Sequence, residues 1–140
     1  MTKITLSSIL LVIFWTSGCT AQQANQLTGT LQGTIGLYEG NCMPGPGIPP
    51  CEPRPISAWI LITEVSETYN PNLLVDSVRS NAEGKYSIRL KEGSYSLFVR
   101  DGDQIVCTEI QCPDSCICHP FIIKLDSVTV IDANLDHATW

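Results

Sequence analysis

Two neighbouring segments of alternating apolar and polar residues restrict the possible fold most strongly. In the first segment, Tyr86, Ile88 and Leu90 alternate with polar residues, and Tyr95 and Leu97 begin the same pattern again in the second. A period of two is typical of a β-strand with one face in a core and one in water. The pattern therefore predicts two strands, each of which contributes one face to a hydrophobic core.

Glycines at the ends of these segments predict tight turns. Gly84 precedes the first segment and Gly93 separates the two. Both positions are ones where a turn commonly needs a positive φ, which costs glycine little strain. The pair Asp101-Gly102 predicts a further reversal into the short apolar segment that follows. Residues 77–100 and their continuation are therefore predicted to form a run of antiparallel hairpins.

The rest of the chain after residue 26 also favours strands. It shows no sustained helical period, and runs rich in Ile, Val, Leu, Tyr and Thr are separated by turn residues, as is typical of strands. About seven strands result, which fits an all-β protein whose sheets pack as an antiparallel sandwich. The remaining predicted strands are residues 32–38, 57–64, 73–78, 121–125 and 128–135.

Trp59 lies in the apolar segment 58–62, whose nearly continuous apolarity predicts a central strand. Large aromatic side chains account for much of the burial in protein cores. We therefore expect Trp59 to anchor the core rather than to form an exposed binding platform.

Four short motifs outline a known arrangement of strands and turns. They are Gly33-Thr34-Ile35, Pro55-Ile56-Ser57-Ala58-Trp59-Ile60, Asn81-Ala82-Glu83-Gly84-Lys85-Tyr86-Ser87-Ile88 and Leu90-Lys91-Glu92-Gly93-Ser94-Tyr95-Ser96-Leu97. Together they resemble the carboxypeptidase regulatory-like domain over approximately residues 29–135. The resemblance implies a transthyretin-like (prealbumin-like) sandwich of about seven strands. It also implies an accessory or binding module without catalysis, which is the usual role of this domain in the family.

The chain departs from the family pattern in two places. One is a proline-rich insertion between Gly40 and Pro55, and the other is a cysteine cluster at residues 107–118. Both are expected between strands, where they would leave the fold intact.

The N-terminal segment predicts export and lipid attachment. Lys3 precedes the apolar run 9–15, which is too short to span a bilayer, and small residues follow it, as in a secretory signal peptide. The motif Thr16-Ser17-Gly18-Cys19 resembles the lipobox of bacterial lipoproteins. That resemblance implies cleavage before Cys19 and attachment of lipid, with palmitate among the acyl chains, to this cysteine.

The chain therefore divides into a signal peptide (1–18), a lipidated N-terminus with an uncharged polar tether (19–26) and a β-sandwich domain (27–140). Cleavage leaves 122 residues, enough for one domain with its own core. Seven basic and fourteen acidic residues remain, giving a net charge of −7. This balance lacks the basic footprint of a nucleic-acid-binding protein, so no nucleic-acid partner is expected.

The predicted location is the bacterial cell envelope, where the lipid would bind the protein to a membrane. Thr20, rather than an aspartate, follows the anchor and resembles the pattern that permits sorting to the outer membrane. Whether the domain faces the periplasm or the exterior is left open.

An even number of cysteines after Cys19 predicts a disulfide framework, because thiols are oxidised outside the cytoplasm. Cys42 and Cys51 flank the Pro- and Gly-rich segment 43–50, which cannot form regular structure. A bond between them would hold this segment in place, so we favour this pair.

The four remaining cysteines lie close together in the sequence. Cys116 and Cys118 are separated by one residue, which is too close for ordinary disulfide geometry. Each is therefore expected to pair with Cys107 or Cys112, and both assignments stay open.

Metal binding is the alternative interpretation of this cluster. Cys112, Cys116, Cys118 and His119 could offer thiolates and an imidazole to a soft metal such as Cu(I) or Zn(II). Their spacing differs from the separated pairs of most structural zinc sites, and disulfides account for the same cysteines. We therefore predict no cofactor, and we expect His119, which precedes Pro120, to face solvent in a loop.

The sequence offers little for catalysis. His119 and His137 are the only histidines, and no Gly-x-Ser-x-Gly motif is present, whereas a hydrolase triad needs a nucleophile beside an oriented base. We therefore predict a non-enzymatic, membrane-anchored binding or structural module with a protein or glycan partner. An enzyme is the least favoured interpretation, and a pocket in which Asp, His and Tyr converge from separate strands would count toward it.

Overall fold

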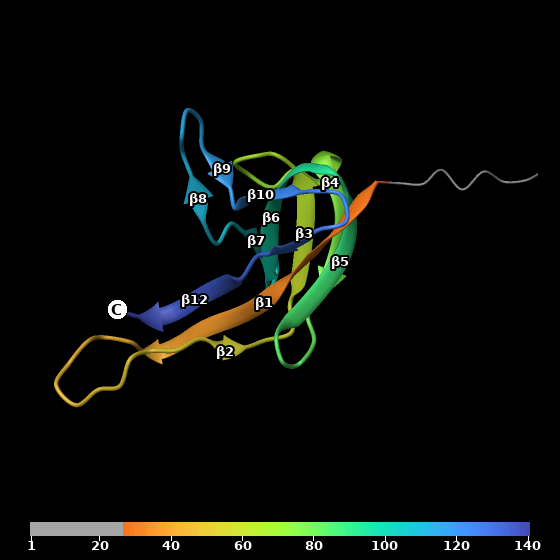
Figure 1. Cartoon of the computed structure of the whole chain (residues 1–140). Helices are drawn as coiled ribbons and strands as arrows, with labels where there is room; N and C mark the ends of the chain where they lie inside the picture. Colours follow the sequence, from red (N-terminus) through yellow and green to blue (C-terminus); the bar gives the residue numbers. More distant parts are fainter. Residues whose placement is uncertain (1–26) are drawn as a thin grey trace, which may run out of the picture.

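The computed structural model (Figure 1) describes residues 27–140, so the predicted signal peptide and tether lie outside the described residues. The described part is an all-β sandwich, as predicted, with one 3-10 turn, η1 (Pro71–Leu73). No helix within residues 27–140 has the length and apolar character needed to cross a membrane. The strands are β1 (Thr28–Asn41), β2 (Arg54–Pro55), β3 (Trp59–Glu64), β4 (Leu74–Arg79), β5 (Lys85–Lys91), β6 (Gly93–Asp101), β7 (Gln104–Val106), β8 (Ile110–Gln111), β9 (Ile117–Cys118), β10 (Pro120–Ile123), β11 (Val128–Val130) and β12 (Ala133–Thr139).

The first sheet is built around the long strand β1. On one edge β1 pairs with β5 and β2, both antiparallel, and on the other edge it pairs with β11 and β12, both parallel. The expected antiparallel sandwich therefore has one edge at which the pairing is parallel. Parallel partners need a long connection, and here the whole chain between β1 and β11 supplies it. A period of two occurs in both kinds of pairing, so the sequence pattern does not distinguish them.

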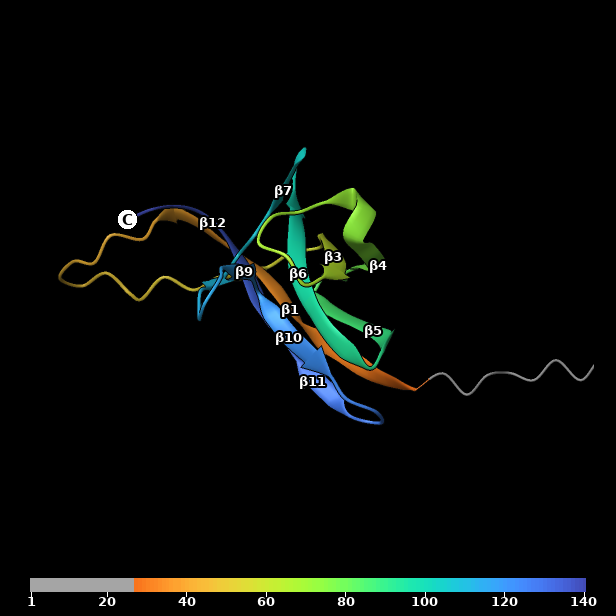
Figure 2. The same cartoon turned by 90° about the horizontal axis from the view of Figure 1, so that it is seen from above.

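The second sheet has the order β10-β6-β3-β4, with β7 paired to the far end of β6, and all its pairs are antiparallel. Figure 2 shows β3, β4, β6 and β7 in this second layer. The two inner faces meet in one hydrophobic cluster. Its fully buried members are Leu31, Ile35, Ile60, Ile62, Leu97, Val99 and Ile123.

The predicted run of hairpins is only partly correct. β5 and β6 belong to different sheets, so the turn at Gly93 (φ 155°) crosses the sandwich, as does the turn at Gly84 (φ 73°) between β4 and β5. Only β6 and β7 form the expected hairpin, in which Asp101 pairs with Gln104. Alternation shows which face of a strand is buried but does not show which strand lies beside it.

Residues 128–135, predicted as one strand, are divided between β11 and β12. The register with β1 is the same on both sides of the break, with Thr30 opposite Val128 and Ile35 opposite Ala133. At the break, the Asp132 carboxylate accepts hydrogen bonds from the backbone N–H (2.8 Å) and hydroxyl (2.9 Å) of Thr34. A side chain therefore replaces the backbone pairing at this point.

Gly33 permits the close approach of the chain at the same break. A Cβ atom at this position would lie 1.7 Å from the carbonyl oxygen of Ile131. That oxygen accepts a hydrogen bond from the Tyr86 hydroxyl (2.6 Å), and burial raises the pKa of Tyr86 well above its usual value. The neutral Tyr86 hydroxyl therefore donates a hydrogen bond from β5, across β1, to the break between β11 and β12.

Trp59 is not the core anchor that we expected, because 42% of its surface is exposed. The next residues of β3, Ile60 to Ile62, are buried on both faces of the sheet. Trp59 lies at the first position of the strand, just beyond the segments that cover the outer face. The continuous apolar run thus indicates a strand that is buried on both faces, but it does not show at which residue of the strand this burial ends.

Candidate functional site

The six cysteines of the described residues form three disulfides: Cys42–Cys51, Cys107–Cys118 and Cys112–Cys116. The first is the pair that the sequence favoured. The other two agree with the expectation that Cys116 and Cys118 each pair with Cys107 or Cys112, and they decide between the two open assignments. Cys19, the predicted lipidation site, lies outside the described residues.

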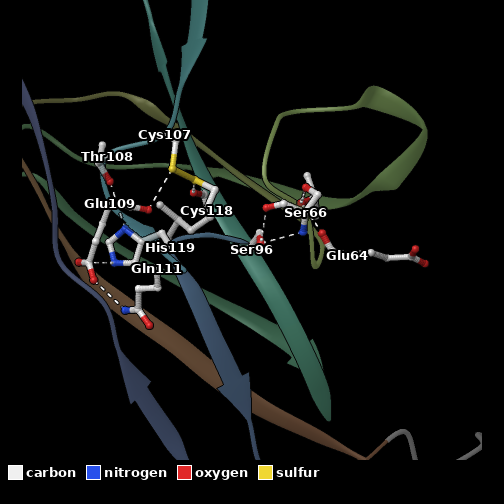
Figure 3. The surroundings of a disulfide bond; sticks show 11 residues. Glu64, Ser66, Ser96, Cys107, Thr108, Glu109, Gln111, Cys118 and His119 are labelled. Carbon is white, nitrogen blue, oxygen red and sulfur yellow. Dashed lines mark hydrogen bonds and ion pairs between the residues drawn. A yellow bond between two sulfur atoms is a disulfide. The ribbon is translucent and has the colours of Figure 1, made fainter. Parts of the chain in front are cut away.

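The Cys107–Cys118 disulfide fastens the segment 107–119, called here the stapled segment, to the outer face of the second sheet (Figure 3). Cys118 is fully buried and packs with Leu61 and Phe98. Its backbone N–H donates to the carbonyl oxygen of Ser66 (2.9 Å). The backbone N–H of Ser66 in turn donates to the Ser96 hydroxyl of β6 (3.0 Å). Disulfide and hydrogen bonds therefore hold two loops against one sheet face.

His119 is buried, which corrects the expectation that it faces solvent. It is 6% exposed and has a positive φ of 33°, which is unusual for a residue other than glycine. Its position follows from its neighbours, because Cys118 is fixed beneath it in the sheet cover and Pro120 begins β10. His119 is thus the last residue of the stapled segment and directly precedes β10 of the second sheet.

Thr108 and Glu109 surround the His119 ring (Figure 3). The Thr108 hydroxyl lies 3.1 Å from Nδ1, and a Glu109 carboxylate oxygen lies 3.7 Å from Nε2. Burial lowers the pKa of His119, and the Glu109 charge opposes this shift only in part. The imidazole is therefore mainly neutral at neutral pH.

The His119 ring borders a cavity of about 290 Å³ between the stapled segment and the first sheet. Asp, His and Tyr from separate elements converge there, which is the arrangement that counts toward an enzyme. The cavity contains no lysine or arginine, so its charged groups are carboxylates beside a neutral imidazole. It is lined by Tyr38, Thr108, Glu109, His119, Asp132, Ala133, Asn134 and Asp136.

Local contacts hold several of these side chains. Asp136 accepts a hydrogen bond from the indole of Trp140 (2.8 Å), and Tyr38 packs edge-on against the same indole at 5.7 Å. Asp132 is held by Thr34 at the strand break described above. None of these residues was predicted from the sequence to form a site, and the one available signal was a charged residue, Asp132, within a predicted strand.

The predicted metal ligands are not arranged around an ion. Cys112, Cys116 and Cys118 are all in disulfides and offer no thiolate, the form that binds metal. Within residues 27–140, no cluster of three or more His, Cys, Asp or Glu side chains is arranged to hold a metal ion. The chemistry available in the cavity is that of an imidazole, a hydroxyl, a phenol and carboxylates.

No protein-family model matches this sequence, and no curated protein sequence matches it. The resemblance to the carboxypeptidase regulatory-like domain therefore rests on the four short motifs alone.

Proposed function

We propose that this protein is a lipid-anchored module of a bacterial cell envelope that binds a partner and catalyses no reaction. The observation that carries the proposal is that the six cysteines of the described residues pair with one another. Such bonds form and persist in oxidising compartments outside the cytoplasm. The odd seventh cysteine, Cys19, has no sulfur partner left among these six and stands in the lipobox-like motif. Lipid attachment gives this thiol a role.

The number of acyl chains determines whether such an anchor is stable. Each buried CH₂ contributes about 0.8 kcal/mol, and a single chain gives only marginal, reversible membrane binding. The lipobox resemblance implies two or three chains on one residue, which would hold the protein at the membrane. The sandwich would then stand one short tether away from the bilayer, consistent with the accessory or binding role that the family resemblance implies.

The anchor is tested by changing Cys19 to Ser in the full chain and measuring how the protein divides between membrane and soluble fractions. We expect Cys19→Ser to leave the membrane fraction with its three disulfides intact. The matched control is Thr20→Ser, which should stay in the membrane fraction with the intact mass of an acylated chain. Retention of Cys19→Ser in washed membranes, or an unacylated wild-type mass, would overturn the proposal.

Copper or zinc binding by Cys112, Cys116, Cys118 and His119 would need these cysteines reduced in the exported protein. Alkylation without reductant, followed by native mass measurement, separates the two states. A mass unchanged by alkylation supports the disulfide module. Alkylated thiols together with a mass that carries copper or zinc would replace it with metal binding.

A hydrolase is the second candidate, and the convergence of side chains around His119 is the observation that favours it. Thr108 and Glu109 stand on opposite nitrogens of the imidazole, and a hydrolytic triad likewise places its base between a hydroxyl and a carboxylate. The test is turnover of a panel of chromogenic esters and amides by the wild type and by His119→Gln. Turnover that disappears in His119→Gln would favour the enzyme, and its absence in both proteins supports the binding module.

A further inference from the structure

Trp59 stands on an open part of the outer face of the second sheet. The next two outward-facing residues of β3, Leu61 and Thr63, are 5% and 0% exposed, because the stapled segment and the loop at Ser66 cover them. The cover ends before Trp59, whose surface is 42% exposed. The exposed part of this indole is therefore accessible to a partner.

Two arginines flank this indole on the neighbouring strands. Arg79 of β4 is directly opposite Trp59, and the pairing of Ile60 with Val99 brings Arg100 of β6 level with Trp59 on its other side. Directly opposite residues in a sheet have Cβ atoms about 5 Å apart and share a face. The order across the outer face is therefore arginine, tryptophan, arginine.

Neither arginine has an acidic partner in the part of the chain that the structure describes. The ion pairs found there involve Arg54, His119 and His137, and both Arg79 and Arg100 are exposed. The Nε–H of Arg79 donates to the Ser57 hydroxyl (3.1 Å), which orients that guanidinium. Two uncompensated positive charges therefore stand beside one exposed indole on a chain with fourteen acidic and eight basic residues.

This combination selects a ligand that is flat, apolar on one face and negatively charged at its edge. Guanidinium groups pair with carboxylates through two parallel hydrogen bonds, and tryptophan and arginine are enriched among residues that dominate binding. The C–H face of a sugar ring can stack on an indole while a carboxylate on the ring reaches the arginines. An extended acidic peptide would instead seek an unpaired sheet edge, whereas Trp59 is on a sheet face.

We propose that Trp59, Arg79 and Arg100 form a binding site for a sugar that carries a carboxylate, such as a uronic acid residue of an acidic glycan. This inference rests on the proposed function, because it names the partner of the binding module. The net acidic charge of the chain opposes a long polyanion at a distance. The site therefore favours a short glycan or the end of a longer one.

The test uses trigalacturonate as the probe and the mature chain with Cys19→Ser, oxidised and free of membrane. Adding Trp140→Phe leaves Trp59 as the only tryptophan after signal cleavage, so its fluorescence reports on the site directly. We expect a saturable change in this fluorescence and weaker binding at higher salt. Trp59→Ala and the double variant Arg79→Gln/Arg100→Gln should each lose about tenfold or more in affinity without a change in Tm.

Matched controls separate the site from general charge. The double variant Arg89→Gln/Lys124→Gln removes the same charge elsewhere and should bind as the wild type does. Trp59→Phe keeps an aromatic ring and should keep part of the affinity. Failure of the wild type to saturate, equal binding of neutral maltotriose or of triglutamate, or an equal loss in the control variant would overturn the proposal. Since the chain tested carries no lipid, this outcome is independent of the anchoring experiment.

Discussion

The two larger disulfide loops are nearly equal in length but differ in what they contact. Cys42 and Cys51 are nine positions apart in the sequence and Cys107 and Cys118 are eleven apart, so loop-closure entropy assigns each disulfide about 2.7 kcal/mol. The first loop projects beyond the far end of β1 (Figure 1), and its Met43 and Ile48 are about half exposed. The second fixes Cys118 in a hydrophobic cluster on the sheet. The two crosslinks therefore differ in how their cysteines pack against the rest of the domain, and not in the length of the loop that each closes.

Removing the packed crosslink should have the largest effect. Cys107→Ala/Cys118→Ala is expected to lower the free energy of unfolding by about 4 kcal/mol, because loop entropy is lost and a cavity forms beside Leu61 and Phe98. Urea unfolding measures the change. A loss no larger than that from removing Cys42 and Cys51 would contradict the comparison.

The cluster beneath the packed crosslink should be sensitive by itself. Leu61→Ala removes a buried side chain and is expected to cost about 3 kcal/mol with all disulfides intact. Val75→Ala, in the neighbouring strand but 47% exposed, is the matched control and should change stability little. Equal changes in Tm for the two variants would show that the stapled segment does not keep water from Leu61 on the outer face of the second sheet.

Removing the projecting crosslink should have a smaller effect. Cys42→Ala/Cys51→Ala is expected to cost about 2 kcal/mol, since Cys42 is covered but belongs to neither hydrophobic cluster. Proteolysis should then cut within residues 43–50 while the remaining domain stays folded. Digestion of the whole domain in the same experiment would contradict this prediction, because it would show that the Cys42–Cys51 disulfide is as important for the fold as the Cys107–Cys118 disulfide.

The smallest expected effect is a pH dependence of stability that comes from His119 in the stapled segment, with no histidine in the Cys42–Cys51 loop to match it. Because the pKa of His119 is lowered in the folded protein, the unfolded chain binds a proton first as pH falls below the ordinary histidine value. Stability should therefore decrease on acidification through that range, and His119→Gln should remove this decrease.

His137 provides the opposite control. Its hydrogen bond with Asp101 raises its pKa, so its contribution is present at low pH and is lost as pH rises through the raised value. His137→Gln should therefore lower stability at acidic pH only. The denaturant concentration at the midpoint of unfolding, measured over the pH range in which histidines titrate, reports both effects. If His119→Gln loses as much stability on acidification as the wild type does, the lowered pKa of His119 is not the cause of that loss.

The strands and turns could be predicted where the deciding interactions are local. Alternation identified β5 and β6, Asp101-Gly102 identified the β6–β7 hairpin, and the proline-rich spacing favoured Cys42–Cys51. Each of these features depends on residues close together in the chain. Local backbone preference and burial of one strand face are enough to reveal them.

The features that the sequence did not reveal depend on contacts between distant segments. Trp59 is exposed because the loop at Ser66 covers only its neighbours in β3, and His119 is buried because Cys118 is fixed beneath it. The two parallel partners of β1, β11 and β12, come from a distant part of the sequence. No local period carries this information, so the candidate site could not be assembled from sequence alone.

The parallel pairing of β1 with β12 has a mechanical consequence. The two strands run side by side from Ile35 opposite Ala133 to Asn41 opposite Thr139, so the start of β1 and the end of β12 lie at opposite ends of the sheet (Figure 1). Tension applied between the start of β1 and the end of β12 would load these hydrogen bonds together in shear, rather than opening them one at a time. We therefore expect the domain to resist forces that pull these two ends of the first sheet apart.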